Sequence, residues 1–169
     1  MSTDLSSQLK HQFIFSMPQL DSDFFSSSLI YLCEHSDEGA MGLVINKPSE
    51  MDLAEVFDQL ELSTRPELEE IPVYTGGPVS RDRGFLLHSK SQHRWKSMLD
   101  LSEGLQLTTS LDVLEAIANG GGPTDYLMVL GYAGWDAGQL EDEFSRNLWL
   151  SCPSNFDILF RTAPEGRLT

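Results

Sequence analysis

Cysteines, basic residues and long apolar runs are all scarce in this chain of 169 residues. Its two cysteines, Cys33 and Cys152, lie far apart and outside any CxxC pattern. This spacing indicates neither a disulfide framework nor a zinc site, and we expect both thiols to be buried as small apolar side chains. No stretch approaches the roughly 18 apolar residues of a membrane span, and residues 1–10 form a polar leader without a signal-like core. The sequence predicts a cytoplasmic protein that has no membrane segment.

Basic residues number 11 against 26 acidic ones, and the net charge is −15. Proteins that bind DNA tightly do so through clustered Lys and Arg side chains that neutralise phosphates. Direct nucleic-acid binding is therefore disfavoured. Solubility explains the acidity most simply, and a dedicated surface for a basic partner is the alternative.

The length of the chain fits one domain, because a domain of this size buries about 70% of its unfolded surface. A hydrophobic content of 40% is ordinary for a globular protein and too high for a disordered one. We expect residues 1–169 to form a single domain, with residues 1–10 as a flexible leader.

Short apolar runs separated by turn residues predict a sheet. The clearest is a hairpin in which Leu29 to Cys33 and Met41 to Ile45 flank a polar loop that ends at Gly39. Further strands are expected at 11–17, 71–75, 85–88, 97–101, 105–108, 126–132 and 147–152. We expect a loop or a single helical turn at 21–28, a loop at 63–70 and a turn at 102–104. Hairpin-length connections favour antiparallel pairing.

Three amphipathic helices are predicted from residue spacing and capping signals. The first carries Leu53, Val56, Phe57 and Leu60 after an N-cap at Ser49; the second follows Thr109 or Ser110 and carries Leu111, Leu114, Ile117 and Ala118; the third starts with a capping box of Asp136 and Gln139 and buries Leu140 and Phe144. Strands outnumber helices. The predicted class is therefore α+β, with a mixed, mainly antiparallel sheet.

An enzymatic function would have to rest on one of two small groups of reactive side chains. Cys33 and His35 stand two apart on one strand, so an ideal strand would place them on the same face as a nucleophile and a base. The residues that could bind a metal are Glu34, His35, Asp82 and His88, but they lack a metal-type spacing such as HExxH. His88 is better explained as a strand-end histidine bonded to backbone.

Polar residues at the strand ends suggest a ligand pocket. Its expected members are Glu34, His35, Asn46, Lys47, Gly76, Gly77, Arg83 and Trp135. Lys47 and Arg83 beside glycine corners could hold an anion, although glycines also occur at simple sheet corners and Lys47 could instead pair with Glu34 across the hairpin. Trp135 and Trp149 are expected as core side chains, and the acidic run 141–143 as a solvated helix face.

The ensemble of these motifs resembles the AlgH/YqgE family of bacterial proteins. The matching residues are Met17-Pro18, Cys33-Glu34-His35, Gly39-Ala40-Met41-Gly42, Asn46-Lys47-Pro48, Gly76-Gly77-Pro78-Val79, Asp82-Arg83-Gly84-Phe85 with His88, Leu130 to Trp135, Gly138 to Glu141 and Asn147-Leu148-Trp149. The resemblance implies a bent, bifurcated sheet that forms a pseudo-barrel with flanking helices. It also implies a cytoplasmic protein, often labelled a transcriptional regulator, with no established enzymatic activity or cofactor. Family members usually continue with a helix beyond 160–169, and here we expect that helix to be missing.

The function expected from all of this is non-catalytic binding or regulation through a protein partner or a small anionic ligand. No cofactor and no metal are expected. The two alternatives are a hydrolase that uses the pocket near Glu34, His35, Asn46, Lys47 and Arg83, and a regulator that binds DNA directly, which the net charge of −15 disfavours. The oligomeric state stays open.

Overall fold

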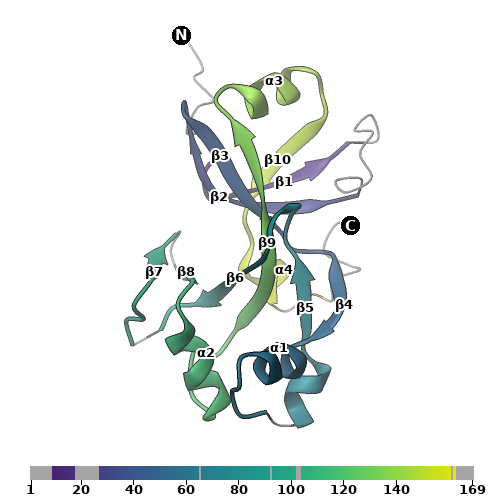
Figure 1. The fold of residues 1–169 in the computed structure, drawn as a ribbon. Coiled ribbons are helices and arrows are strands. Elements are labelled where there is room, and N and C mark those ends of the chain that lie inside the picture. Colours follow the sequence, from purple (N-terminus) through teal and green to yellow (C-terminus); the bar gives the residue numbers. More distant parts are fainter. Residues whose placement is uncertain are drawn as a thin grey trace.

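The computed structural model describes residues 9–17, 27–64, 66–91, 93–101, 104–160 and 162. Within these residues, ten strands form a branched sheet, and short helices lie outside it (Figure 1). The strands are β1 (Gln12–Ser16), β2 (Leu29–Ser36), β3 (Gly39–Val44), β4 (Pro48–Asp52), β5 (Pro72–Thr75), β6 (Val79–Ser89), β7 (Met98–Asp100), β8 (Leu105–Thr108), β9 (Tyr126–Asp136) and β10 (Trp149–Pro153). The helices are α1 (Leu53–Gln59), the 3-10 helix η1 (Pro66–Glu70), α2 (Leu111–Ala118), α3 (Gln139–Ser145) and α4 (Phe156–Phe160).

The sheet branches at β9, which runs the length of the molecule (Figure 1). Residues 133–136 of β9 pair with β3, residues 128–130 pair in parallel with β5, and residues 126–132 pair with β6. We call β10, β1, β2 and β3 with the end of β9 the upper lobe, and β4 to β8 with the start of β9 the lower lobe. Every described pair except β5 with β9 is antiparallel. The α+β prediction with a mixed, mainly antiparallel, bifurcated sheet is confirmed.

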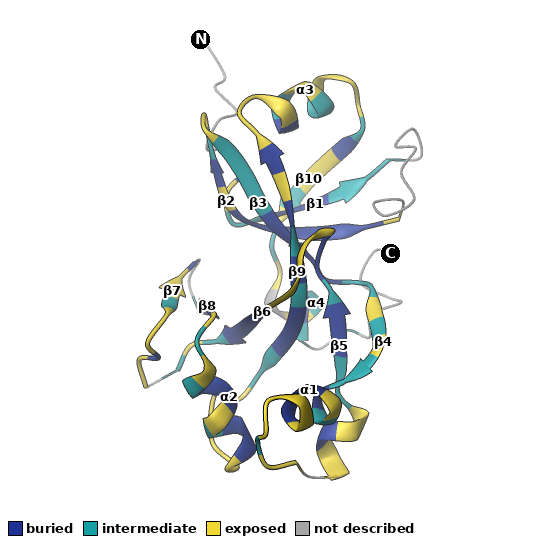
Figure 2. Cartoon of the chain, viewed as in Figure 1, coloured by how far each residue is buried: buried dark blue, intermediate teal, exposed yellow. Residues whose placement is uncertain are grey.

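Three apolar clusters hold the curled sheet and its helices together. The inner cluster lies between the lobes and includes Tyr31, Leu43, Phe85 and Val129, with Leu159 of α4 against it. The lower outer cluster lies under α1 and α2, and its buried members include Phe57, Leu86, Val113 and Met128. The upper outer cluster lies under α3, and its buried members include Ile30, Trp135, Leu140 and Trp149. In Figure 2, β9 is accordingly dark along much of its length while the outer surfaces of α1 and α2 are exposed.

A bulge at Gly131 allows β9 to serve both lobes. Side chains alternate along a regular strand, so residues four apart share a face. Val129 nevertheless lies in the inner cluster whereas Ala133 lies in the upper outer cluster. Gly131 between them has a φ of +81°, and the β6–β9 register shifts between Val79 and Gly84. The extra residues of β6 at 80–83 leave the sheet as an exposed bulge.

The first helix starts later than its sequence predicts. Its N-cap is Asp52, whose carboxylate accepts the backbone N–H of Glu55 at 2.9 Å. Ser49 was the expected cap, but it lies in β4 and donates its hydroxyl to the Val73 carbonyl at 2.6 Å. Pairing with β5 therefore extends the strand through the predicted start of the helix. Leu60, expected on the buried face, is 40% exposed.

Two other predicted boundaries also need correction. The expected loop at 63–70 contains η1, and its Leu68 is buried despite the acidic neighbours. Asp136 is the last residue of β9 rather than the cap of α3, which is Gly138. Half of the expected capping box is present, because the Asp136 N–H donates to Oε1 of Gln139 at 2.9 Å.

Strand β4 was not predicted, the other strands overlap their predicted ranges, and β6 and β9 are longer than expected. Helix α4 was not predicted. The expectations for the leader at 1–10, the loop at 21–28, the turn at 102–104 and the chain beyond 160 lie wholly or largely outside the described residues. Of the helices in the described ranges, none is long and apolar enough to cross a bilayer.

Candidate functional site

The predicted pocket residues divide between two parts of the sheet. Glu34, His35 and Trp135 lie in the upper lobe, where His35 and Trp135 contact α3, whereas Asn46, Lys47, Gly76, Gly77 and Arg83 lie where the two lobes join. In each group, contacts within the protein account for most of these polar residues and glycines, so their presence does not require a ligand.

His35 is buried under α3. It pairs with Ala40 of β3, which in turn pairs with Trp135 of β9, so the three side chains share one face of the upper lobe. Its Nε2 lies 3.4 Å from the Glu141 carboxylate, and neither ring nitrogen has a hydrogen-bond partner among the described residues. Glu34 is exposed and lies 3.7 Å from the Lys10 ammonium. The expected pairing of Glu34 with Lys47 is therefore replaced by one with Lys10.

Glu143 fastens α3 to the sheet. Its Oε1 accepts the indole N–H of Trp135 at 3.0 Å and that of Trp149 at 2.9 Å, and its Oε2 accepts from Gln139 at 3.1 Å. The two indole rings meet edge to face, with centroids 5.9 Å apart. The prediction that 141–143 is a solvated face is wrong for Glu143 and for Glu141, which are half-buried. No local signal marks this role, because the two tryptophans reach Glu143 from separate strands.

Cys33 and His35 do not form a catalytic pair. The β2–β3 register shifts between Leu32 and Glu34, so Cys33 lies in the inner cluster while His35 lies on the opposite face under α3. Burial, with a smaller contribution from the Glu34 charge, raises the pKa of the Cys33 thiol to about 12. A thiol with such a pKa stays protonated at neutral pH and is a poor nucleophile. Cys152, expected to be buried, is only half-buried.

Glycines at the junction of the lobes permit a close backbone crossing. A Cβ on Gly77 would lie 1.9 Å from the Tyr132 carbonyl carbon, and one on Gly76 would lie 2.5 Å from the Gly131 oxygen. The Gly76 N–H also donates to the Leu130 carbonyl at 2.8 Å. These glycines therefore act as sheet corners, where only a hydrogen fits between two backbones.

Asn46, Lys47 and Arg83 belong to the same group of predicted pocket residues. Asn46 ties two backbone segments together, because its Oδ1 accepts the Leu29 N–H at 3.0 Å and its Nδ2 donates to the Ser27 carbonyl at 2.9 Å. Lys47 is half-buried, and burial lowers its pKa. Arg83 is exposed in the β6 bulge, with its guanidinium 5.2 Å from the Phe85 ring centroid. An anion-binding role for Lys47 and Arg83 stays a prediction.

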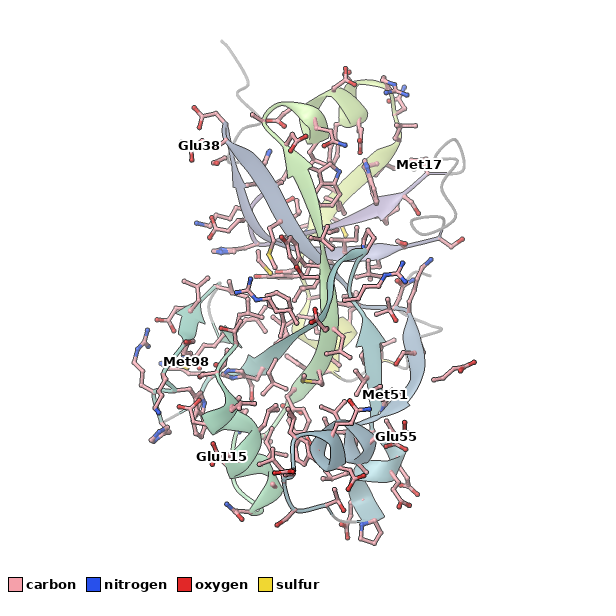
Figure 3. The ribbon with its side chains drawn as sticks, in the orientation of Figure 1. Met17, Glu38, Met51, Glu55, Met98 and Glu115 are labelled. Carbon is pink, nitrogen blue, oxygen red and sulfur yellow. The ribbon has the colours of Figure 1, made fainter. Side chains whose placement is uncertain are left out.

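A sizeable cavity lies elsewhere, between α1 and α2 on the outer face of the lower lobe. It has a volume of about 420 Å³ and is lined by Met51, Val56, Gln59, Leu60, Arg81, Asp82, Gly84, Leu86, Thr108, Thr109, Ser110, Leu111, Val113, Leu114, Met128 and Leu130. A second cavity of about 330 Å³ adjoins it and shares Met51, Arg81 and Leu130. Figure 3 shows the Met51 side chain beside α1. We call the larger cavity the groove.

The groove was not predicted from the sequence, although two leucines that line it had been noticed as members of helices. Leu60 and Leu111 were assigned to buried helix faces, yet they are 40% and 54% exposed beside the groove. Apolar periodicity predicts which side chains leave water, but it cannot show that two helix faces remain partly uncovered.

A third, polar cleft of about 350 Å³ lies between Lys90, Ser91, His93 and Trp95 on one side and the loop after α2 on the other. It is lined by Lys90, Ser91, His93, Trp95, Gly122, Pro123 and Thr124. Nearby His88 is buried, with Nδ1 2.8 Å from the Ser89 carbonyl and Nε2 2.8 Å from the Thr108 hydroxyl. Its expected role as a strand-end histidine bonded to backbone is confirmed. Within the described part of the chain, no three or more His, Cys, Asp or Glu side chains are grouped to hold a metal ion.

Known proteins match this chain over nearly its whole length. Residues 13–169 match the family described as AlgH-like, DUF179. A UPF0301 protein of Thioalkalivibrio sulfidiphilus is 49% identical over 162 residues, covering 96% of this chain and 87% of that protein. A UPF0301 protein of Ralstonia pickettii is 48% identical over 167 residues, covering 98% and 87%.

Solved structures share the fold. The solution structure of the AlgH protein from Pseudomonas aeruginosa superposes with a TM-score of 0.84 at 48% identity, covering 99% of this chain and 88% of that one. The crystal structure of protein DIP2367 from Corynebacterium diphtheriae, at 19% identity, gives a TM-score of 0.73 and supports the fold alone. The resemblance drawn from the sequence motifs is confirmed: this chain belongs to the AlgH-like family of UPF0301 proteins.

Proposed function

We propose that this protein is a non-catalytic binding protein that takes a small molecule with an apolar body and an anionic end into the groove between α1 and α2. One observation carries the proposal: a cavity of about 420 Å³ lined mainly by apolar side chains, with Arg81 where it meets the adjoining cavity. Ligand pockets in proteins have volumes of about 300 to 1,000 Å³ and combine apolar walls with a few polar groups.

The walls of the groove favour an apolar ligand body. Met51, Leu86, Leu114 and Met128 reach it from two strands, a helix and the end of β4. Burial of apolar ligand surface against them contributes about 25 cal/mol per Å². Methionine side chains also adapt their shape to a ligand, because they are unbranched and polarizable.

The position of Arg81 favours an anionic end. Of the charged described residues around these two cavities, Arg81 is shared by both, whereas Asp82 lines only the larger cavity and Glu50 only the smaller. Guanidinium groups bind carboxylates and phosphates through paired hydrogen bonds. Ser80, next to Arg81, has a φ of +47°, and such backbone strain in a non-glycine residue is typical of ligand sites.

The alternative functions have less support. A hydrolase that uses Cys33 would need a thiolate, which the raised pKa of about 12 disfavours at neutral pH. Direct DNA binding is disfavoured by the net charge of −15. Regulation remains compatible with the proposal, because occupancy of the groove is a signal that a partner protein could read.

Titration calorimetry with decanoate tests the proposal. Leu111→Asp places a carboxylate beside the apolar groove at a position that is 54% exposed, so we expect the variant to fold and to lose at least tenfold in affinity. Leu150→Asp is the matched control, because Leu150 is 45% exposed on β10 and does not line the groove. Arg81→Gln should weaken binding of decanoate more than that of decanol. Equal decanoate affinity in the two aspartate variants, or no binding to the unmodified protein, would overturn the proposal.

A further inference from the structure

The polar cleft that Lys90, Ser91, His93 and Trp95 form with residues 122–124 differs from the two other cavities of this acidic protein. Each of its polar side chains can donate a hydrogen bond; these side chains are Lys90, Ser91, His93, Trp95 and Thr124. None of the described residues that line it is a carboxylate. The chain has 26 acidic residues against 11 basic ones, and the two other cavities described above each include one acid, Asp82 or Glu50. A lining without a carboxylate among its described residues is therefore unusual for this composition.

One of these donors has no partner. Trp95 is 8% exposed, and its indole N–H makes no hydrogen bond within the described part of the chain. The other two indoles behave differently, because those of Trp135 and Trp149 both donate to Glu143. Buried polar groups in native proteins nearly always have partners, and an exception is often explained by an unseen ion or ligand.

The frame of the cleft is fixed by hydrogen bonds and ring contacts. The Ser91 N–H donates to Oε1 of Gln106 at 3.0 Å, and the His93 N–H donates to the Ser91 hydroxyl at 3.2 Å. The His93 ring lies 4.3 Å from the Trp95 ring between centroids. These contacts tie Ser91 to β8 and hold His93 close to Ser91 and Trp95.

Asp100, an acid near this segment, is engaged by two other side chains. Asp100 accepts from Nε2 of Gln106 at 2.8 Å and from the Arg94 guanidinium at 3.2 Å. Lys90 is exposed and lines the cleft. Lys90 therefore brings a basic side chain to the cleft. The pKa of Asp100 is lowered mainly by its hydrogen bonds with Gln106 and Arg94, and the charge of Lys90 contributes less.

We propose that this cleft binds the phosphoryl group of a small phosphorylated molecule. Lys90 supplies the charge, and the hydroxyls of Ser91 and Thr124 with the indole N–H of Trp95 supply donors to the phosphoryl oxygens. A phosphoryl group has three strong acceptor oxygens and suits several convergent donors better than a carboxylate does. The site is separate from the groove and does not depend on the function proposed for it.

Indole N–H signals in NMR spectra of the full chain test this inference directly. Inorganic phosphate and phenyl phosphate are titrated separately at constant ionic strength. We expect the assigned Trp95 signal to shift with saturation, while the signals of Trp135 and Trp149 stay in place because Glu143 already accepts them. Phenyl phosphate should bind at least as tightly as phosphate, because the cleft exceeds the size of the bare ion.

Two lysine variants separate a site from a general charge effect. Lys90→Gln should weaken phosphate binding roughly tenfold, since it removes one charge-assisted contact. Lys10→Gln is the control, because Lys10 is an exposed cation paired with Glu34 in the upper lobe, and it should bind phosphate normally. The inference is overturned if the Trp95 signal does not move, if chloride moves it equally, if Lys90→Gln binds like Lys10→Gln, or if only an RNA oligomer binds.

Discussion

Removal of the Glu143 carboxylate should loosen the packing of α3 on the upper lobe. One carboxylate oxygen accepts both indole N–H groups, at 3.0 and 2.9 Å, and Trp135 and Trp149 are 7% and 1% exposed. In Glu143→Ala these two donors lose their shared acceptor. A buried donor left without a partner costs about 1 to 3 kcal/mol. Since Glu143 itself is half-buried, water can reach part of the vacated space, and we expect a loss of about 2 to 4 kcal/mol.

Urea denaturation followed by tryptophan fluorescence measures this loss. Glu143→Gln keeps a neutral oxygen acceptor and should lose about 1 kcal/mol or less. Asp142→Ala is the control, because Asp142 is exposed and its contact with Arg146 at 3.5 Å joins residues one helical turn apart. Such a pair contributes about 0.3 to 0.5 kcal/mol. If Glu143→Ala were no more destabilised than Asp142→Ala, the assigned role of Glu143 would be refuted.

Three further predictions concern the junction of the lobes and the inner cluster. Gly77→Ala should lower the free energy of unfolding by about 3 kcal/mol or more in urea denaturation, since its Cβ would lie 1.9 Å from the Tyr132 carbonyl carbon. The control Gly134→Ala, whose Cβ would have its closest contact at 3.5 Å, should cost less than about 1 kcal/mol. Equal losses in the two variants would contradict this account. Asn46→Ala should cost about 1 to 2 kcal/mol in the same assay, because it removes two hydrogen bonds to backbone groups, and an unchanged midpoint would count against that role. Because the pKa of the Cys33 thiol is raised to about 12 on folding, the unfolded state releases this proton at a lower pH than the native state does. The free energy of unfolding should therefore fall as pH rises from about 9 toward 12, and it should fall less in Cys33→Ala. Parallel curves of stability against pH for the two proteins would argue against a buried neutral thiol.

Local patterns in the sequence were sufficient for much of the fold. The hairpin of β2 and β3 was predictable because β-rich runs flank a short loop, and β9 because Tyr126 to Tyr132 is the most hydrophobic run. The cap of α1 was not, since Ser49 and Asp52 are both good N-caps and only pairing with β5 decides between them.

The site was less predictable, because bulges and helix packing depend on distant partners. The bulge beside Cys33 moves His35 to the opposite face, where Glu141 meets it from more than 100 residues along the chain. Spacing along an ideal strand gives no warning of such a shift. The groove likewise forms between helices whose mutual distance no local pattern specifies. Arg81 was not singled out from the sequence, and its place beside an apolar cavity required the folded chain.

The central claim is that the groove between α1 and α2 binds a ligand, and methionine methyl groups report on it most directly. Met51 and Met128 line the groove, whereas Met41 and Met98 do not. NMR spectra of methyl-labelled methionine during a decanoate titration should show saturable shifts at Met51 and Met128 and little change at Met41 and Met98. Unchanged Met51 and Met128 signals, or shifts confined to Met41, would contradict the proposed binding function.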